Sequence, residues 1–396
     1  MALQKKIFSL GFDVAPKVLA SSAIQKRNAS SDVAALNVAS LKKGLGGRSS
    51  FSGTVATVFG ASGFMGRYVV NRLGKIGSQV IIPYRGDSYD VRHLKLAGDL
   101  GQIMFMEYHL EDEESIRRAV KYSNVVINLV GRDWETMNFD FEKVHIEGAH
   151  RLAAISKEMG VKKFIHVSAL NCDRDHEGYI LEGGSKYLKT KGEGEKAVRA
   201  AFPEATIMRP SETYGQEDRF LRYYAGKWRH QGRVMPLPLG GNGVWKMPVH
   251  VPDVAQGIVN AIKNPEAVGQ TYEAVGPRKY ELNELVEWFH RVMRKEGEAG
   301  ILTYDMKWDP IIKLKARITE LGPSWPVGTL TRDKIEREAV SDVLSGLPTL
   351  EDLGVNLTKM EDQVPWELRP FRANSDYQED VGEFEVASPP KYLAAH

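Results

Sequence analysis

Short apolar runs alternate with amphipathic segments along the first half of this chain. The runs are rich in β-branched residues and close on turns, which is typical of buried parallel strands. The strands expected are Val55–Phe59, Gln79–Pro83, Ile103–Tyr108, Asn124–Val130, Phe164–Ser168 and Ala205–Met208. Apolar residues recur between them at helical spacing, which predicts helices over Arg67–Lys75, Val91–Leu100, Glu113–Lys121, Phe141–Met159 and Lys186–Ala201.

This alternation predicts an α/β fold, a doubly wound parallel sheet of the Rossmann type with helices on both faces. Right-handed crossovers place the strand-to-helix turns at one edge, where ligands bind. Gly- and Pro-rich turns after Pro210 predict a small lobe, and Val251–Ile262 reads as a helix. We therefore expect a nucleotide-binding domain with its lobe over residues 53–275, a C-terminal interaction region over 276–371 and an acidic extended tail over 372–396.

The glycine turn after the first strand carries the strongest chemical signal. The turn contains Gly60, Gly63 and Gly66, which follow a predicted strand and precede a predicted helix. In this position between strand and helix, the glycine spacing is a strong indication of dinucleotide binding. Gly60 permits the tight turn, Gly63 lets a pyrophosphate approach the backbone, and Gly66 permits close packing. The free N–H groups and the helix dipole then attract an anion without a lysine. A turn with packing glycines alone is the alternative.

The end of the second strand bears on which dinucleotide binds. An NAD site usually carries a carboxylate there, bonded to the ribose 2′-hydroxyl. This strand is followed by Arg85, and Arg67 follows the glycine turn. Two guanidinium groups suit a 2′-phosphate, so NADP(H) is the expected cofactor, with FAD a weaker possibility. Asp87 stands against this choice, and both arginines could instead be solvated surface charges.

A serine, a tyrosine and a lysine are placed as a hydride-transfer site needs them. Ser168 ends the fifth strand, and Tyr187 and Lys191 are four residues apart on one helix. Such a tyrosine exchanges a proton with a carbonyl or alcohol, the lysine lowers its pKa, and the serine polarises the carbonyl. The alternative is that Tyr187 packs and Lys191 is one more surface cation.

The expected cofactor contacts are drawn from the glycine turn and from the ends of the later strands. They are Gly60, Ser62, Gly63, Phe64, Met65, Gly66, Arg67, Arg85, Leu110, Asn128, Leu129, Val130, Ser168, Tyr187, Lys191 and Pro210. His109, His145, His166 and His250 are scattered and show no metal-ligand spacing, so no metal site is expected.

The N-terminal segment differs in composition from the rest. Residues 1–48 hold eight lysines and arginines against Asp13 and Asp32, with frequent serine and alanine. This predicts a mitochondrial targeting segment and leader over residues 1–45, with a disordered basic tail as the alternative.

Composition narrows the function classes further. The 396-residue chain has 53 basic and 51 acidic residues, a net charge of +2, which gives no reason to expect nucleic-acid binding. The single cysteine, Cys172, excludes an internal disulfide. No apolar run approaches the roughly 18 residues of a spanning helix. Any association with a membrane is therefore expected to be peripheral.

Several motifs resemble known families. Gly60-Ala-Ser-Gly-Phe-Met-Gly66, His166-Val-Ser168, Tyr187-Leu-Lys-Thr-Lys191 and Arg209-Pro-Ser-Glu-Thr-Tyr-Gly215 resemble the extended and atypical short-chain dehydrogenase/reductases. Asn124-Val-Val-Ile-Asn-Leu-Val-Gly-Arg-Asp-Trp-Glu135, Glu217-Asp-Arg-Phe-Leu221 and Leu330-Thr-Arg-Asp-Lys334 resemble the alpha-subcomplex subunit 9 family of mitochondrial NADH:ubiquinone oxidoreductase, complex I. The second resemblance covers nearly the whole chain after the leader.

This resemblance implies an accessory, non-catalytic subunit of complex I with a tightly held structural NADP(H). It also implies a peripheral position on the matrix side of the inner membrane, near the junction of the two arms. Its partners would then be other complex I subunits. Two departures bear on catalysis: His145 stands where active extended members usually carry an asparagine, and Ala169 follows Ser168. Ser168, Tyr187 and Lys191 are then vestigial candidates for catalysis.

The C-terminal third adds one amphipathic segment, Pro310–Leu321, in which isoleucines and leucines alternate with Lys313, Lys315 and Arg317. It suits an anionic membrane surface or a partner groove, or an ordinary helix packed on its own domain. Two other functions remain open from the residues alone. They are an active NADP-dependent reductase or epimerase, and a sensor of the matrix NADPH/NADP ratio.

Overall fold

The computed structural model describes residues 41–226, 229, 234–295, 301–321, 330–373 and 385–394. A seven-stranded sheet lies at its centre, with the strand order β11-β6-β5-β4-β1-β2-β3 and every neighbouring pair parallel. Its strands are β1 (Val55–Phe59), β2 (Gln79–Tyr84), β3 (Ile103–Glu107), β4 (Val125–Asn128), β5 (Lys163–Val167), β6 (Thr206–Pro210) and β11 (Thr271–Ala274). The order reverses between β1 and β4, which is where such sheets bind ligands.

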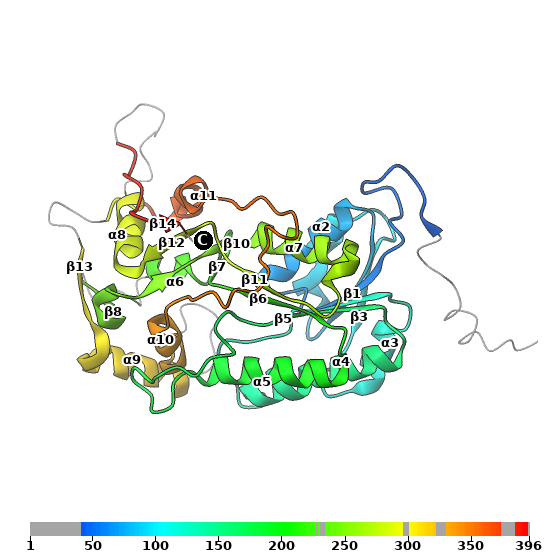
Figure 1. Ribbon diagram of the computed structural model, residues 1–396, viewed down its shortest axis with the longest axis horizontal. Coiled ribbons are helices and arrows are strands. Elements are labelled where there is room, and N and C mark those ends of the chain that lie inside the picture. Colours follow the sequence, from blue (N-terminus) through cyan, green and yellow to red (C-terminus); the bar gives the residue numbers. More distant parts are fainter. Residues whose placement is uncertain are drawn as a thin grey trace, which may run out of the picture.

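Helices cover both faces of this sheet (Figure 1). One face carries α2 (Phe64–Lys75) and α7 (Val251–Lys263), and the other carries α3 (Glu113–Val120), α4 (Ala149–Glu158) and α5 (Lys186–Ala201). The expected doubly wound α/β fold is therefore confirmed. Its strands read as continuous apolar runs because both of their faces are buried.

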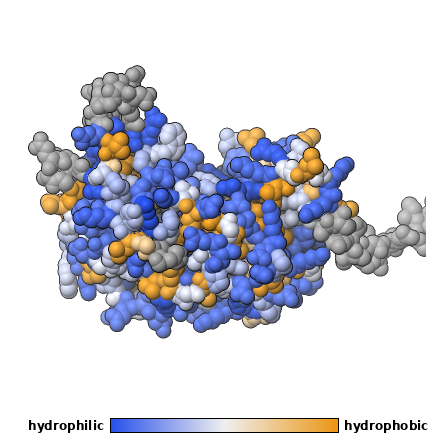
Figure 2. All heavy atoms as spheres, turned by 45° about the horizontal axis from the view of Figure 1, so that its top comes forward, coloured by the Kyte–Doolittle hydropathy of each residue, from blue (hydrophilic) through white to orange (hydrophobic). Residues whose placement is uncertain are grey.

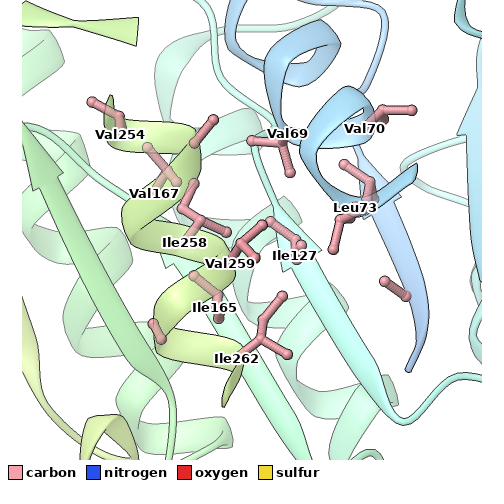
Figure 3. Packing of buried hydrophobic residues seen from close by; sticks show 14 of the residues in the cluster. Val69, Val70, Leu73, Ile127, Ile165, Val167, Val254, Ile258, Val259 and Ile262 are labelled. Carbon is pink, nitrogen blue, oxygen red and sulfur yellow. The ribbon is translucent and has the colours of Figure 1, made fainter. Parts of the chain in front are cut away.

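The α2–α7 face holds the larger part of the domain's apolar core (Figure 3). Val69 and Leu73 of α2 meet Ile258 of α7 above the sheet, and the side chains of Ile127 and Ile165 rise from β4 and β5 beneath them. All five are fully or almost fully buried. On the opposite face, alternate strand residues such as Phe59, Val126 and Phe164 pack against α3, α4 and α5.

Three elements differ from those expected from the sequence. Residues 88–97 form 3-10 turns rather than the α-helix expected over Val91–Leu100, because their two buried residues, Val91 and Leu94, are three apart and match that tighter winding. The helix expected over Phe141–Met159 opens with a π-helical segment, Lys143–Gly148. The seventh strand, β11, was not expected, since its Thr271–Ala274 run is short.

The lobe combines the segment after β6 with the C-terminal region around one aromatic-rich core. That core draws on Tyr224, Trp288, Phe289, Met306 and Ile335, among others. Its helices are α6 (Leu221–Ala225), α8 (Leu282–Val292), α9 (Pro310–Leu321), α10 (Arg332–Ala339) and α11 (Met360–Glu367). Its strands are β7 (Thr213–Tyr214), β8 (Val234–Leu237), β9 (Trp245–Lys246), β10 (Val249–His250), β12 (Arg278–Glu281), β13 (Leu302–Asp305) and β14 (Leu393–Ala394).

A buried ion pair joins α10 to the segment after α6. Arg229 donates to both carboxylate oxygens of Glu338, and each of the two side chains is 2% exposed. The hydroxyls of Tyr223 and Tyr224 donate to the same carboxylate. A buried charge needs partners of this kind, so α10 is fixed firmly against the lobe.

The face of the molecule seen in Figure 2 is mostly hydrophilic, with hydrophobic residues scattered across it. Helix α9 is an exception, because Ile312 and Ala316 are buried while Ile311, Leu314 and Ile318 are about half exposed. The expectation of a helix at Pro310–Leu321 is confirmed. In the described part of the chain, no helix is long and apolar enough to cross a membrane. Residues 1–40 of the expected targeting segment and leader lie outside the described residues, as do residues 374–384 and 395–396 of the expected acidic tail.

The packing predicts the effect of shortening one core side chain. Ile258→Ala should lower the free energy of unfolding by about 2–5 kcal/mol, because it leaves a cavity between α7 and the sheet. Ile311→Ala is the matched control, since Ile311 is 52% exposed, and should change it by less than about 0.5 kcal/mol. Denaturant titration of both variants measures the difference, and equal midpoints would contradict this core.

Candidate functional site

A cavity of about 290 Å³ opens at the carboxyl edge of the sheet, beside the point where the strand order reverses. Ten of the expected contact residues line it: Gly60, Gly63, Phe64, Met65, Gly66, Leu129, Ser168, Tyr187, Lys191 and Pro210. The rest of its wall includes residues far away in the sequence, Arg132, Arg219, Lys246, Arg337 and Asp342. The fold therefore brings the glycine turn, the Ser-Tyr-Lys group and the C-terminal region to one place.

The space around the position of a Cβ atom differs among the three glycines of the turn. Gly60 has φ +79°, and a Cβ there would lie 2.9 Å from the carbonyl carbon of Leu129. A Cβ on Gly66 would lie 2.4 Å from the carbonyl oxygen of Ala61, so this residue must be glycine for helix and turn to meet. A Cβ on Gly63 would meet only the carbonyl oxygen of Gly60, at 3.2 Å, and otherwise faces open space.

The N-terminus of α2 has the features of an anion site. Gly63 is its N-cap and provides no side-chain cap, and the first turn contains no acidic residue. The first N–H groups of the helix therefore have no side-chain acceptor, while the helix dipole favours negative charge there. Gly63, Phe64, Met65 and Gly66 all line the cavity. This cradle fits a pyrophosphate on structural grounds, because its backbone is both open and electropositive.

The two arginines expected to read a 2′-phosphate lie in different surroundings. Arg85 is exposed just after β2, and its guanidinium lies 5.1 Å from the ring centre of Phe139. Arg67 pairs instead with Glu217 and does not line the cavity. Asp87, which argued against NADP(H), accepts from the backbone N–H of Tyr89 and caps the 3-10 segment.

Ser168, Tyr187 and Lys191 meet at the far end of the cavity. Ser168 is buried, with its hydroxyl 3.5 Å from the Sγ of Cys172. The Nζ of Lys191 donates to the carbonyl of Val167 at 3.2 Å. Burial lowers the pKa of Lys191 to about 8 and raises that of Tyr187 to about 12. The residues expected from the sequence are present, but the raised pKa of Tyr187 is unfavourable for proton exchange at neutral pH.

His145 is locked into the structure beside this group. Its Nε2 accepts from the backbone N–H of Arg132 at 3.4 Å, so its Nδ1 is the nitrogen that donates to the hydroxyl of Thr190. Burial lowers its pKa to about 2, which keeps the ring neutral. The ring stacks on Phe141 and stands edge-on to Tyr187. It acts as a packing and positioning group with no free nitrogen.

Sequence reasoning missed Arg337, which comes from α10. Its guanidinium lies 4.3 Å from the ring centre of Tyr187, and its ion pairs with Asp333 and Asp133 are loose, at 3.6 and 3.8 Å. The residue follows the Leu330–Lys334 motif, but no local pattern reveals its position. Only the packing of α10 on the lobe brings it across 150 residues of sequence to Tyr187.

The chain after α10 crosses the same end of the cavity, and we call residues 340–346 the C-terminal strap. Asn171 binds it twice, donating to the carbonyl of Ser341 and accepting from the N–H of Val343. Asp342 accepts from the N–H of Met247 at 2.8 Å. Val340 and Asp342 line the cavity, so the strap forms part of its wall.

Six expected contacts do not line the cavity: Ser62, Arg67, Arg85, Leu110, Asn128 and Val130. The side chain of Asn128 is used internally, since it donates to Nδ1 of His166 and accepts from the N–H of Val130. Leu110 is buried against the position of Gly148. Within the described ranges there is no group of three or more metal-ligating side chains.

Comparisons with known proteins agree with this geometry. Residues 56–275 match the model of the NAD dependent epimerase/dehydratase family. The chain is 46% identical over 359 residues to NADH dehydrogenase (ubiquinone) 1 alpha subcomplex subunit 9, mitochondrial, of Mus musculus, covering 90% of each chain. It is 37% identical to the NADH-ubiquinone oxidoreductase 40 kDa subunit, mitochondrial, of Neurospora crassa, over 91% of this chain and 92% of that one.

Among solved structures, the triphenylmethane reductase of Citrobacter, complexed with NADP(H), superposes with a TM-score of 0.59. The match covers 79% of this chain and all of that one, at 14% identity, so it shows a shared fold.

Two glycine variants should separate fold from ligand binding. Gly66→Ala should cost about 1–3 kcal/mol of unfolding free energy with or without nucleotide, because its Cβ would overlap Ala61. Gly63→Ala should cost less than about 1 kcal/mol, since its φ of −74° suits alanine, but should weaken dinucleotide binding about tenfold or more. Denaturation and binding titrations test both. Equal effects of the two variants on both quantities would refute these separate roles.

The buried lysine should leave a signature in the pH dependence of stability. An unfolded lysine titrates near its usual pKa of 10.5, so between about pH 8 and 10.5 the unfolded chain binds more protons than the folded protein. The free energy of unfolding should therefore rise with pH across this window. Lys191→Met should remove that rise, as measured by denaturation of nucleotide-free protein at about pH 7 and 9.5. Parallel pH dependences in both proteins would count against a depressed lysine pKa.

Proposed function

This chain belongs to the NAD dependent epimerase/dehydratase family and, within it, to the family of the alpha subcomplex subunit 9 of mitochondrial NADH dehydrogenase (ubiquinone). From that membership we propose that it is an accessory, non-catalytic subunit of respiratory complex I. In this role it holds a structural NADP(H) that supports assembly and stability of the matrix arm near its junction with the membrane arm.

The glycine cradle supports the bound dinucleotide. Gly60 and Gly66 have no room for a side chain, whereas Gly63 faces open space beside the free N–H groups of α2. Arg85, where an NAD site usually has a carboxylate, favours the phosphorylated nucleotide. A bound NADP(H) supplies negative charge and a nicotinamide ring to this edge of the sheet. FAD is the weaker alternative.

The contact between Arg337 and Tyr187 is the observation that carries the non-catalytic assignment. The guanidinium of Arg337 covers the tyrosine ring from a distance of 4.3 Å, and the C-terminal strap lies beside it. Arg337 and the strap residues Val340 and Asp342 line the same cavity as Tyr187, so they take up space beside the position that a substrate carbonyl would need. His145 offers no free nitrogen for a proton relay, because both of its ring nitrogens are bonded. These features favour retention of a ligand over turnover.

The walls of the cavity explain how a bound nucleotide would stabilise the whole subunit. They come from the glycine turn, from the ends of β4, β5 and β6, and from the C-terminal region through Arg337, Val340 and Asp342. A ligand that binds only the folded state stabilises it by about 4 kcal/mol when its free concentration exceeds Kd a thousandfold. The nucleotide therefore acts on both parts of the molecule at once.

The proposed location is the matrix side of the inner membrane, as a peripheral subunit. The basic N-terminal segment supports import into mitochondria. The exposed apolar residues of α9, next to Lys313, Lys315 and Arg317, provide a surface for other subunits of the arm junction or for the lipid beside them.

One observation favours a second candidate function, an active NADP-dependent reductase or epimerase. Ser168, Tyr187 and Lys191 line the same cavity as the glycine turn, as hydride transfer requires. A third, redox sensing, requires different affinities for NADPH and NADP, because equal affinities shift no equilibrium.

Cells that lack the subunit and are complemented with single variants distinguish these functions. Gly63→Val should lower the level of assembled complex I severalfold, because the larger side chain fills the pyrophosphate cradle. Tyr187→Phe should leave both assembly and NADH:ubiquinone activity within about twofold of wild type, since a structural nucleotide needs no proton donor. Native gels measure assembly, and mass spectrometry of the purified complex identifies the released nucleotide.

About one NADP(H) per subunit is expected in wild type and in Tyr187→Phe. Normal assembly with Gly63→Val, or release of flavin in place of NADP(H), would contradict the proposal. A reaction lost only in Tyr187→Phe would favour the reductase instead.

A further inference from the structure

Three arginines, two of which line the cavity, lie against aromatic rings. The guanidiniums of Arg132 and Arg219 lie 5.1 and 4.6 Å from the ring centre of Trp134. That of Arg85 lies 5.1 Å from the ring centre of Phe139. Arg132 and Arg219 line the cavity itself. The rings hold the side chains in place without neutralising their charge.

The positive charge of this group is not balanced by the protein. Asp133 is the nearby carboxylate, and it is already bonded to Arg219 at 2.5 Å and faces Arg337 at 3.8 Å. In the described ranges, no acidic side chain forms an ion pair with Arg132 or with Arg85. Burial, together with the charges of Arg85 and Arg219, lowers the pKa of Arg132. One carboxylate, Asp133, thus faces several guanidiniums that repel one another, and the group keeps a net positive charge.

The strand order explains why this site lies at the glycine turn. Strands β2 and β4 are the two neighbours of β1, and the glycine turn follows β1. Arg85 comes immediately after β2, and Arg132 follows Gly131 in the segment after β4. The two arginines therefore flank the N-terminus of α2 from either side.

The backbone of Arg132 is fixed in this position. Its N–H donates to Nε2 of the buried His145, and a Cβ on the preceding Gly131 would lie 3.0 Å from the Nζ of Lys191. The side chain thus starts beside the Ser-Tyr-Lys group and lies close enough to Arg85 for their charges to interact. Arg67, by contrast, is paired with Glu217 and does not line the cavity.

We propose that Arg132 is a phosphate-binding residue of the nucleotide site, acting with Arg85 across the glycine turn, and that Arg67 is not. This inference rests on the proposed function, since it requires that a dinucleotide binds. The phosphate is either the pyrophosphate at the N-terminus of α2, which lines the same cavity as Arg132, or the 2′-phosphate beside Arg85 after β2. Arginine binds either group bidentately.

Binding titrations with the full chain purified without its leader and freed of nucleotide test the assignment. Arg132→Gln should weaken NADPH binding about 10- to 100-fold, the usual effect of losing a charged hydrogen-bond donor. Arg67→Gln should change it less than about threefold. Arg92→Gln is the matched control, because Arg92 also stacks on an aromatic ring, Tyr89 at 5.6 Å, but lies outside the cavity.

A comparison of NADPH with NADH identifies the phosphate. A loss for NADPH alone assigns Arg132 to the 2′-phosphate, whereas equal losses for both assign it to the pyrophosphate, and either result supports the proposal. Thermal melting gives a second readout. Nucleotide-free Arg132→Gln should melt at the same temperature as wild type or higher, because it removes like-charge repulsion, while with NADPH it should melt lower.

Unchanged NADPH affinity in Arg132→Gln, or an equal loss in Arg92→Gln, overturns the proposal. So does a melting temperature that falls equally with and without nucleotide, since that would show a structural role. If wild type itself binds neither NADPH nor NADH, the proposed function fails first and the inference with it.

Discussion

The close approach of backbone to backbone at the β1–α2 corner is the constraint on which the rest of this structure depends. A side chain at Gly66 would lie 2.4 Å from the carbonyl oxygen of Ala61, and one at Gly60 would meet the backbone of Leu129 at 2.9 Å. With hydrogen atoms there instead, α2 begins directly above the carboxyl edge of the sheet. Its N-terminus then faces the cavity with its N–H groups free, so an anion site results from packing alone.

The C-terminal region adds side chains to the wall of this site that the parallel sheet alone does not provide. Helix α10 is held by the buried pair of Arg229 and Glu338, and from there Arg337 lies over Tyr187. The strap that follows is fixed by Asn171 and by the N–H of Met247. The C-terminal region thus supplies part of the wall of the cavity that holds Ser168, Tyr187 and Lys191. Under the proposed function, these contacts favour retention of a nucleotide over turnover.

The ion pairs near the cavity determine which of the arginines there remain without an acidic partner. Asp133 is engaged by Arg219, and Glu217 by Arg67, which leaves Arg132 and Arg85 as the cations on either side of the glycine turn. Arg132 is half-buried and Arg85 is exposed, and neither forms an ion pair in the described ranges, so both can bind an anionic ligand. The nucleotide of the proposed function would supply the negative charge that these two arginines lack.

The sequence by itself determined the parallel sheet, the glycine turn and the helix carrying Tyr187 and Lys191. Each of these depends on local spacing. Apolar runs and glycines three apart can be recognised in the sequence without knowing which residues they contact in the fold. The 3-10 winding at residues 88–97 and the short strand β11 were missed because their local signals are weak and packing decides them.

Only the tertiary structure decided which residues share the cavity. Arg337 meets Tyr187 across 150 residues, and Arg67, which the sequence placed beside a phosphate, is paired with Glu217 from the loop after β7. Ion pairs and stacking of this kind depend on how the lobe packs on the sheet. Such long-range contacts leave no periodicity in the chain. The helices and strands could therefore be predicted from the sequence, whereas the partners of the charged side chains could not.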